Sequence, residues 1–142
     1  MPVALDRGAM LRDFAITLPS GARRLLSDFR GRRLLVLVFA GDSDAATESL
    51  LSDLAADPAE LDYQEALVVA IGHNHPHGFA TAAESPRDFY SAEQAGQPSA
   101  AVFITDRYGE ICFAARAARN ENLPTAAEVF SWLDFINRQC PE

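Results

Sequence analysis

Two runs of the chain are apolar at every position and are bounded by polar residues. Residues 34–39 read Leu-Leu-Val-Leu-Val-Phe, and residues 66–71 read Ala-Leu-Val-Val-Ala-Ile. Unbroken apolar runs of this length are typical of strands that are covered on both faces. The pattern therefore predicts two central strands of a parallel or mixed α/β sheet. Shorter strands are expected at residues 13–18, 23–26, 100–105 and 111–115.

Other segments repeat their apolar residues at helical spacing. Ala46, Leu50 and Leu54 share one stripe after the first central strand, and Ser43 or Asp44 can cap its start. Three more helix starts are marked by a capping residue or a proline: Asp57-Pro58, Ser85-Pro86 with a helix to about Ala95, and the capping box Thr125–Glu128. The last helix carries the apolar stripe Val129, Trp132, Leu133, Ile136 and Cys140.

The order of these elements defines a fold class. A β-hairpin is followed by β, α, β, α, β, β and α, with a tight loop at residues 106–109 joining the last two strands. With a right-handed crossover between the central strands, this order gives a three-layer α/β/α sandwich with a mixed central sheet. The chain has 142 residues and shows no repeat or long linker. We therefore expect a single domain over residues 1–142.

Several short motifs occur in the order found in a known family. Asp13-Phe14-x-x-x-Leu18-Pro19 resembles the opening of peroxiredoxins and related redoxins, and Leu26-Ser-Asp-Phe-Arg-Gly-Arg32 resembles the element before their central strand. Gln97-Pro98 resembles the cis-proline of thioredoxin-type proteins, and Asp106-x-x-Gly109 resembles their hairpin. From about Phe14 to Ile136 the chain thus resembles a redoxin of the peroxiredoxin-like (AhpC/TSA) type. The resemblance implies a thioredoxin-like fold with an N-terminal β-hairpin.

The resemblance also shows where the family's chemistry is missing. In thiol–disulfide redoxins, a Cys-x-x-Cys starts five residues after the aromatic residue that ends the central strand. Counted from Phe39, these two positions hold Asp44 and Thr47, and residues 40–51 contain no Cys and no Pro. Redoxin catalysis needs a thiolate at a helix N-terminus, and a capping aspartate cannot replace it. The leading hypothesis is therefore a binding or regulatory module with no catalytic residue.

The two cysteines leave a second hypothesis open, a peroxidase or disulfide oxidoreductase that uses a relocated thiol. Cys112 lies in the strand expected at residues 111–115, where a free cysteine is most often a small buried hydrophobe. Gln139-Cys140-Pro141 resembles the surroundings of a resolving cysteine near a peroxiredoxin C-terminus. A resolving cysteine has no role without a peroxidatic one, so a packed terminal thiol is the plain interpretation.

The three histidines suggest a third hypothesis, a metal-binding protein. They fall in one short segment, His73-Asn-His75-Pro-His77. In an extended segment alternate side chains point the same way, so three imidazoles could bind Zn²⁺, Cu²⁺ or Ni²⁺. The plain interpretation is a solvated loop, and no other cofactor is expected. An acidic patch at the same expected sheet edge either caps the helix or completes a cation site: Asp42, Asp44, Thr47 and Glu48.

Charge and composition narrow the choice of partners. The net charge of −8 disfavours nucleic acid and an anionic membrane surface. Arg30, Arg32 and Arg33 form a cluster too small for a nucleic-acid footprint, and we interpret it as solvated surface. The expected partner is therefore a protein or small ligand of unknown identity, and a homodimer stays open.

The same composition bears on location and source. No apolar run reaches the roughly 18 residues of a membrane span, and the first residues lack the pattern of a signal peptide. Two cysteines are too few for a disulfide framework. We therefore expect a cytoplasmic protein. All twelve basic residues are arginine, which indicates a GC-rich, bacterial source.

Overall fold

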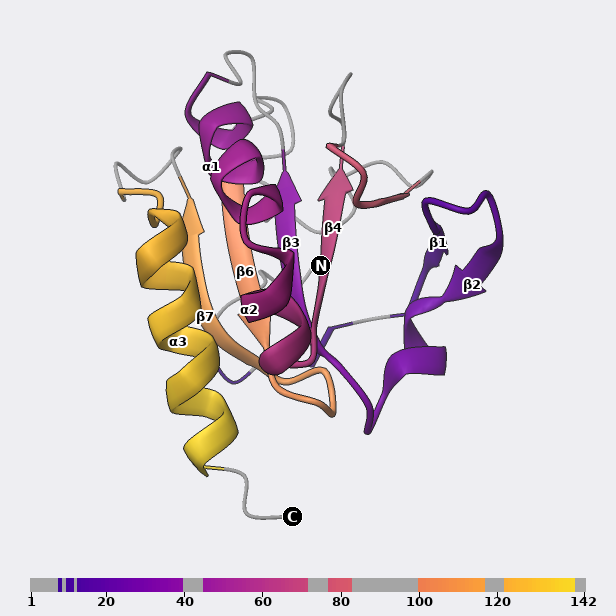
Figure 1. Ribbon diagram of the computed structural model, residues 1–142. Coiled ribbons are helices and arrows are strands. Elements are labelled where there is room, and N and C mark those ends of the chain that lie inside the picture. Colours follow the sequence, from indigo (N-terminus) through magenta and orange to yellow (C-terminus); the bar gives the residue numbers. More distant parts are fainter. Residues whose placement is uncertain are drawn as a thin grey trace.

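The computed structural model describes residues 8, 10–11, 13–39, 45–71, 77–82, 100–116 and 122–139. Its strands form one sheet in the order β2-β1-β5-β4-β3-β6-β7 (Figure 1). β3 is parallel to β4 and β4 to β5, whereas the other neighbouring strands are antiparallel. The predicted mixed α/β sheet is thus confirmed. The strands are β1 (Ala15–Thr17), β2 (Arg23–Leu25), β3 (Leu34–Phe39), β4 (Ala66–Ile71), β5 (Ala80–Ala82), β6 (Ala101–Thr105) and β7 (Ile111–Arg116).

The central strand β3 is covered on both faces, as its unbroken apolar run predicts. All six of its residues are buried. Leu34, Val36 and Val38 belong to the core on the helical side, and the alternate residues belong to a second core on the opposite face. In that second core, the rings of Phe39 and Phe103 meet edge to face with centroids 5.5 Å apart. The strand therefore joins two separate apolar cores.

The helices are α1 (Ala45–Ala55), α2 (Pro58–Tyr63) and α3 (Ala126–Gln139), and all three lie on one side of the sheet (Figure 1). Their starts follow the predicted capping chemistry. The Asp57 carboxylate accepts from the Glu60 amide at 3.3 Å, and the Thr125 hydroxyl accepts from the Glu128 amide at 3.2 Å. The helix expected over residues 86–95 lies outside the described residues. None of the described helices is long and apolar enough to cross a membrane.

The motif that begins at Asp13 and the motif that begins at Leu26 are joined by hydrogen bonds next to the second core. The Ser27 amide and hydroxyl donate to the two carboxylate oxygens of Asp13 at 2.9 and 2.7 Å. The Phe14 carbonyl accepts from the Leu26 amide at 3.0 Å. Burial raises the pKa of Asp13, but the bonds from Ser27 and the nearby Arg30 outweigh it and leave the pKa below its ordinary value. These motifs therefore have a structural role, which is to fix the short 3₁₀ helix η1 (Leu26–Phe29).

Several details differ from the sequence-based expectation. The strands expected at residues 13–18, 100–105 and 111–115 span 15–17, 101–105 and 111–116. The strand expected over residues 23–26 ends at Leu25, because Leu26 already belongs to η1. The short strand β5 was not predicted at all. It reads Ala-Thr-Ala and is paired on both sides, with β1 and with β4. Two of its three residues are alanines, which have little strand preference, so pairing with the neighbouring strands determines its conformation.

Candidate functional site

The first candidate site is the edge of the sheet where β3 ends and α1 begins. β3 ends at Phe39 and α1 begins at Ala45. Asp42 and Asp44 lie outside the described residues. Thr47, in the first turn of α1, is 0% exposed. The position that matches the second cysteine of a Cys-x-x-Cys is therefore enclosed by the fold, and Thr47 is not part of an acidic surface patch.

One histidine of the segment at residues 73–77 reaches this edge. His77 Nε2 lies 2.9 Å from Glu48 Oε1, and their side chains are 19% and 32% exposed. Glu48 is in the first turn of α1, whereas His77 lies between β4 and β5 with a left-handed φ of 55°. The structure therefore brings together one member of the histidine segment and one member of the acidic patch. The ring donates to the carboxylate when neutral and forms an ion pair with it when protonated.

Other candidate positions cannot be placed. His73, His75, Pro98 and Cys140 lie outside the described residues. Within the part of the chain that the structure describes, no three His, Cys, Asp or Glu side chains form a group able to hold a metal ion. The metal site and the cis-proline therefore stay predictions.

Cys112 occupies a different region of the molecule. It is the second residue of β7, which runs in the same direction as β3, because each is antiparallel to β6. Its thiol is therefore at the end of the sheet opposite to the start of α1. Cys112 is partly exposed, and its Sγ lies 3.6 Å from the Glu110 carbonyl oxygen. It lines a groove of about 490 Å³ with Trp132 and Phe135. The N-terminus of α1 cannot stabilise a thiolate at this place.

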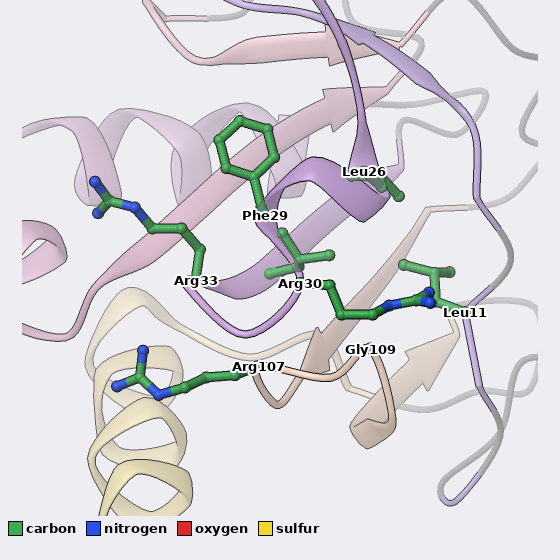
Figure 2. Close-up of a pocket in the computed structure, with 8 residues that line it drawn as sticks. Leu11, Leu26, Phe29, Arg30, Arg33, Arg107 and Gly109 are labelled. Atoms are coloured by element: carbon green, nitrogen blue, oxygen red, sulfur yellow. The ribbon is translucent and has the colours of Figure 1, made fainter. Parts of the chain in front are cut away.

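The end of the sheet opposite to the start of α1 also holds a set of arginines, more than the sequence indicates. Arg33 precedes β3, and Arg107 lies in the hairpin between β6 and β7. Figure 2 shows Arg33 and Arg107 extending to the same side of these loops, while Arg30 points toward Gly109. Arg33 is partly buried. The interpretation of the cluster as solvated surface is therefore incomplete, and Arg107 was missed because it is far away in the sequence.

The comparisons with known proteins agree with the fold. No family model and no curated protein matches the chain. Among solved structures, Enterococcus faecalis AhpC has a TM-score of 0.69 and 18% identity, covering 98% of this chain and 100% of that one. The reduced Plasmodium vivax 2-Cys peroxiredoxin has a TM-score of 0.68 and 11% identity, covering 94% and 82%. The peroxidoxin BcpB of Mycobacterium tuberculosis has a TM-score of 0.64 and 15% identity, covering 94% and 97%.

These likenesses extend over nearly the whole chain. Together with the sheet order, they show that the protein has a thioredoxin-like α/β fold of the kind found in peroxiredoxins. At identities of 11–18% the likeness is one of fold. Fold alone does not define chemistry, so the function has to be argued from the residues at the site.

Proposed function

We propose that this protein is a peroxiredoxin-like thioredoxin-fold protein that has lost thiol catalysis and acts as a binding or regulatory module. One observation carries the proposal. The segment from residue 40 to residue 51 contains no cysteine, and Thr47 within it is completely buried. A redoxin needs a thiolate that a peroxide or disulfide can reach at this helix N-terminus. An aspartate or a buried threonine supplies no such nucleophile.

The position of Cys112 supports the same conclusion. Its thiol is at the opposite end of the sheet from the start of α1, as the strand directions require. The backbone N–H groups and dipole that stabilise a thiolate in redoxins are therefore too far away to act on it. The proposed partner is a protein or a small ligand in the cytoplasm, where the two cysteines would be reduced.

A turnover assay tests this function directly. Peroxide consumption and disulfide reduction are measured with an excess of dithiol reductant for the wild-type protein, Cys112→Ser, Cys140→Ser and the double variant. We expect the four proteins to give the same background rate. Turnover in the wild type that Cys112→Ser or Cys140→Ser abolishes would instead establish an oxidoreductase with a relocated thiol.

A second candidate function, metal binding by the histidine segment, has one specific observation in its favour. The contact between His77 and Glu48 at 2.9 Å is the kind of carboxylate–imidazole pair that orients metal-binding histidines. The carboxylate engages Nε2, so His77 would bind a metal ion through Nδ1. His73 and His75 would supply the other imidazoles for Zn²⁺, Cu²⁺ or Ni²⁺.

Thermal unfolding with each metal at pH 7.5 and pH 5.5 tests this second candidate. If the three histidines share a metal, saturation raises the midpoint at pH 7.5, and the shift shrinks at pH 5.5 because protons compete for the imidazoles. Removal of all three histidines should abolish the shift. Glu48→Gln should weaken binding by about 10–100-fold through loss of the orienting carboxylate. An unchanged midpoint at pH 7.5, or a shift that survives the triple His→Ala variant, would exclude the site.

A further inference from the structure

A polar depression lies at the amino ends of the central strands, at the opposite end of the sheet from α1's N-terminus. It has a volume of about 380 Å³. Arg33 leads into β3, and Glu65 leads into β4 from the end of α2. We call this depression the basic pocket. Its lining residues are Arg24, Asp28, Phe29, Arg32, Arg33 and Glu65.

The two carboxylates of the basic pocket already have partners. Glu65 Oε1 accepts from Arg107 Nη2 at 2.7 Å. Asp28 Oδ2 accepts from the Leu25 amide at 3.1 Å, at the start of η1. The Glu65 backbone has a left-handed φ of 56°, and its carbonyl accepts from the Leu34 amide at 3.0 Å. These bonds hold both acidic groups in place: the charge of Glu65 is balanced by Arg107, and Asp28 keeps its negative charge within the basic pocket.

Hydrogen bonds also hold the Arg107 guanidinium in place. Its Nη1 donates to the Arg32 carbonyl at 3.1 Å, and its Nη2 donates to Asn137 Oδ1 at 2.8 Å. Asn137 in turn donates to the backbone and side-chain oxygens of Gln64, which is only 3% exposed. A partly buried polar network, with Gln64 at its buried end, therefore holds Arg107 beside the basic pocket.

The arginines that line the basic pocket carry more positive charge than its carboxylates balance. Among the described residues, Arg32 and Arg33 have no ion-pair partner, and Arg24 donates to the neutral Arg23 carbonyl at 2.9 Å. Arg107 lies beside the basic pocket and balances Glu65, so the three lining arginines are left with one carboxylate, that of Asp28, and two positive charges are unbalanced. Like charges held together repel one another, and this occurs on a chain whose net charge is −8. A bound anion would relieve that repulsion.

From these observations we infer that the basic pocket binds a small anion carrying a phosphate group, such as a phosphate monoester or pyrophosphate. Guanidinium forks match the oxygens of a phosphate in a bidentate geometry. A phosphate monoester carries about 1.5–2 negative charges near pH 7, which balances the excess. The volume suits a small molecule, and Phe29 offers an apolar wall for its organic part. This inference does not rest on the proposed function, because the two sites lie at opposite ends of the sheet.

Calorimetric titration tests the site with named probes. Inorganic phosphate, inorganic pyrophosphate and succinate are titrated at low ionic strength into the wild type, Arg32→Gln/Arg33→Gln and Arg23→Gln/Arg138→Gln. The third protein is the matched control, because it loses the same charge outside the basic pocket. Each guanidinium removed should raise the dissociation constant for pyrophosphate about tenfold, because a hydrogen bond to a charged group contributes at least the free energy of a tenfold change in affinity. The control should bind like the wild type, and added salt should weaken all phosphate binding.

Three results would overturn the inference: no binding of either phosphate probe to the wild type, equal weakening in the double variant and its control, or succinate binding as tightly as pyrophosphate. Nuclear magnetic resonance of the wild type gives an answer even if the double variant does not fold. Pyrophosphate should then shift the backbone amide signals of Arg32, Arg33 and Glu65. Shifts confined to other parts of the protein would place the anion elsewhere and contradict the assignment.

Discussion

The two ends of the central sheet differ in what their polar residues do. At the carboxyl end of β3, where redoxins carry their thiol, the described polar groups include a buried threonine, Thr47, and the pair His77–Glu48. At the amino end, Arg107, Asn137 and the buried Gln64 form a partly buried hydrogen-bonded network, beside two arginines with no ion-pair partner among the described residues. Under the proposed function, the fold is kept while the thiol chemistry at the carboxyl end of β3 is lost.

The largest effect is expected where α1 meets the sheet. Leu51 is 0% exposed in the core on the helical side. Leu51→Ala should lower the free energy of unfolding by about 2–5 kcal/mol, through lost burial and the cavity left behind. Urea unfolding measures this loss of free energy, and Ser52→Ala on the exposed face of the same helix is the control. A loss below about 1 kcal/mol would show that the apolar stripe does not anchor the helix.

A smaller effect is expected from the amino-end network. Asn137→Ala removes the bonds to Gln64 and Arg107, and it leaves the buried amide of Gln64 with fewer partners. Leaving a buried polar group unsatisfied costs about 1–3 kcal/mol. Equilibrium unfolding of Asn137→Ala is compared with Gln139→Ala, an exposed neighbour on α3. If the two variants are equally stable, the amino end has no special structural role.

The pair His77–Glu48 at the carboxyl end should contribute less to the free energy of unfolding. His77 and Glu48 are both partly exposed, and such pairs contribute about 0–1 kcal/mol. Glu48→Gln should therefore destabilise the fold by less than Asn137→Ala does. A double-mutant cycle with His77→Gln measures the coupling between the two side chains. A coupling larger than the whole effect of Asn137→Ala would reverse the contrast between the ends.

The smallest effect concerns pH and the N-terminal motifs. The Asp13 pKa is lowered in the folded protein, so the unfolded chain binds more protons as the solution becomes acidic. The stabilisation by Asp13 is complete above the ordinary aspartate pKa, near 3.9, and is lost as pH falls through the lower folded value. Urea unfolding from pH 7 to pH 3 should show a shallower acid loss for Asp13→Asn than for the wild type. Parallel curves would mean that the bonds from Ser27 do not favour the charged form.

The sequence predicts most of this architecture because its signals are local. The unbroken apolar runs give β3 and β4 with the bounds that the structure shows, and Asp57 and Thr125 mark helix starts by bonds within four residues. β5 escapes prediction because its pairing with β1 and β4, rather than its own three residues, makes it a strand.

The sites are harder to predict, because they depend on contacts between distant parts of the chain. Counting from Phe39 locates Thr47 but says nothing about its burial. His77 and Glu48 are 29 residues apart, and Arg107 and Arg32 are 75 residues apart. Neither pair leaves a pattern in the sequence, so only the folded chain shows that Arg107 lies beside the basic pocket.

The central claim is that a redoxin fold is present without a redox-active thiol, and thiol reactivity tests it most directly. The second-order rate constant for hydrogen peroxide is measured under single-turnover conditions, with the sulfenic acid product trapped and located by mass spectrometry. The wild type, Cys112→Ser and Cys140→Ser are compared with N-acetylcysteine in the same buffer. We predict that each protein thiol reacts no faster than this free thiol, because none lies in the segment that precedes and begins α1. A rate constant orders of magnitude higher, lost on replacing one cysteine by serine, would contradict the account.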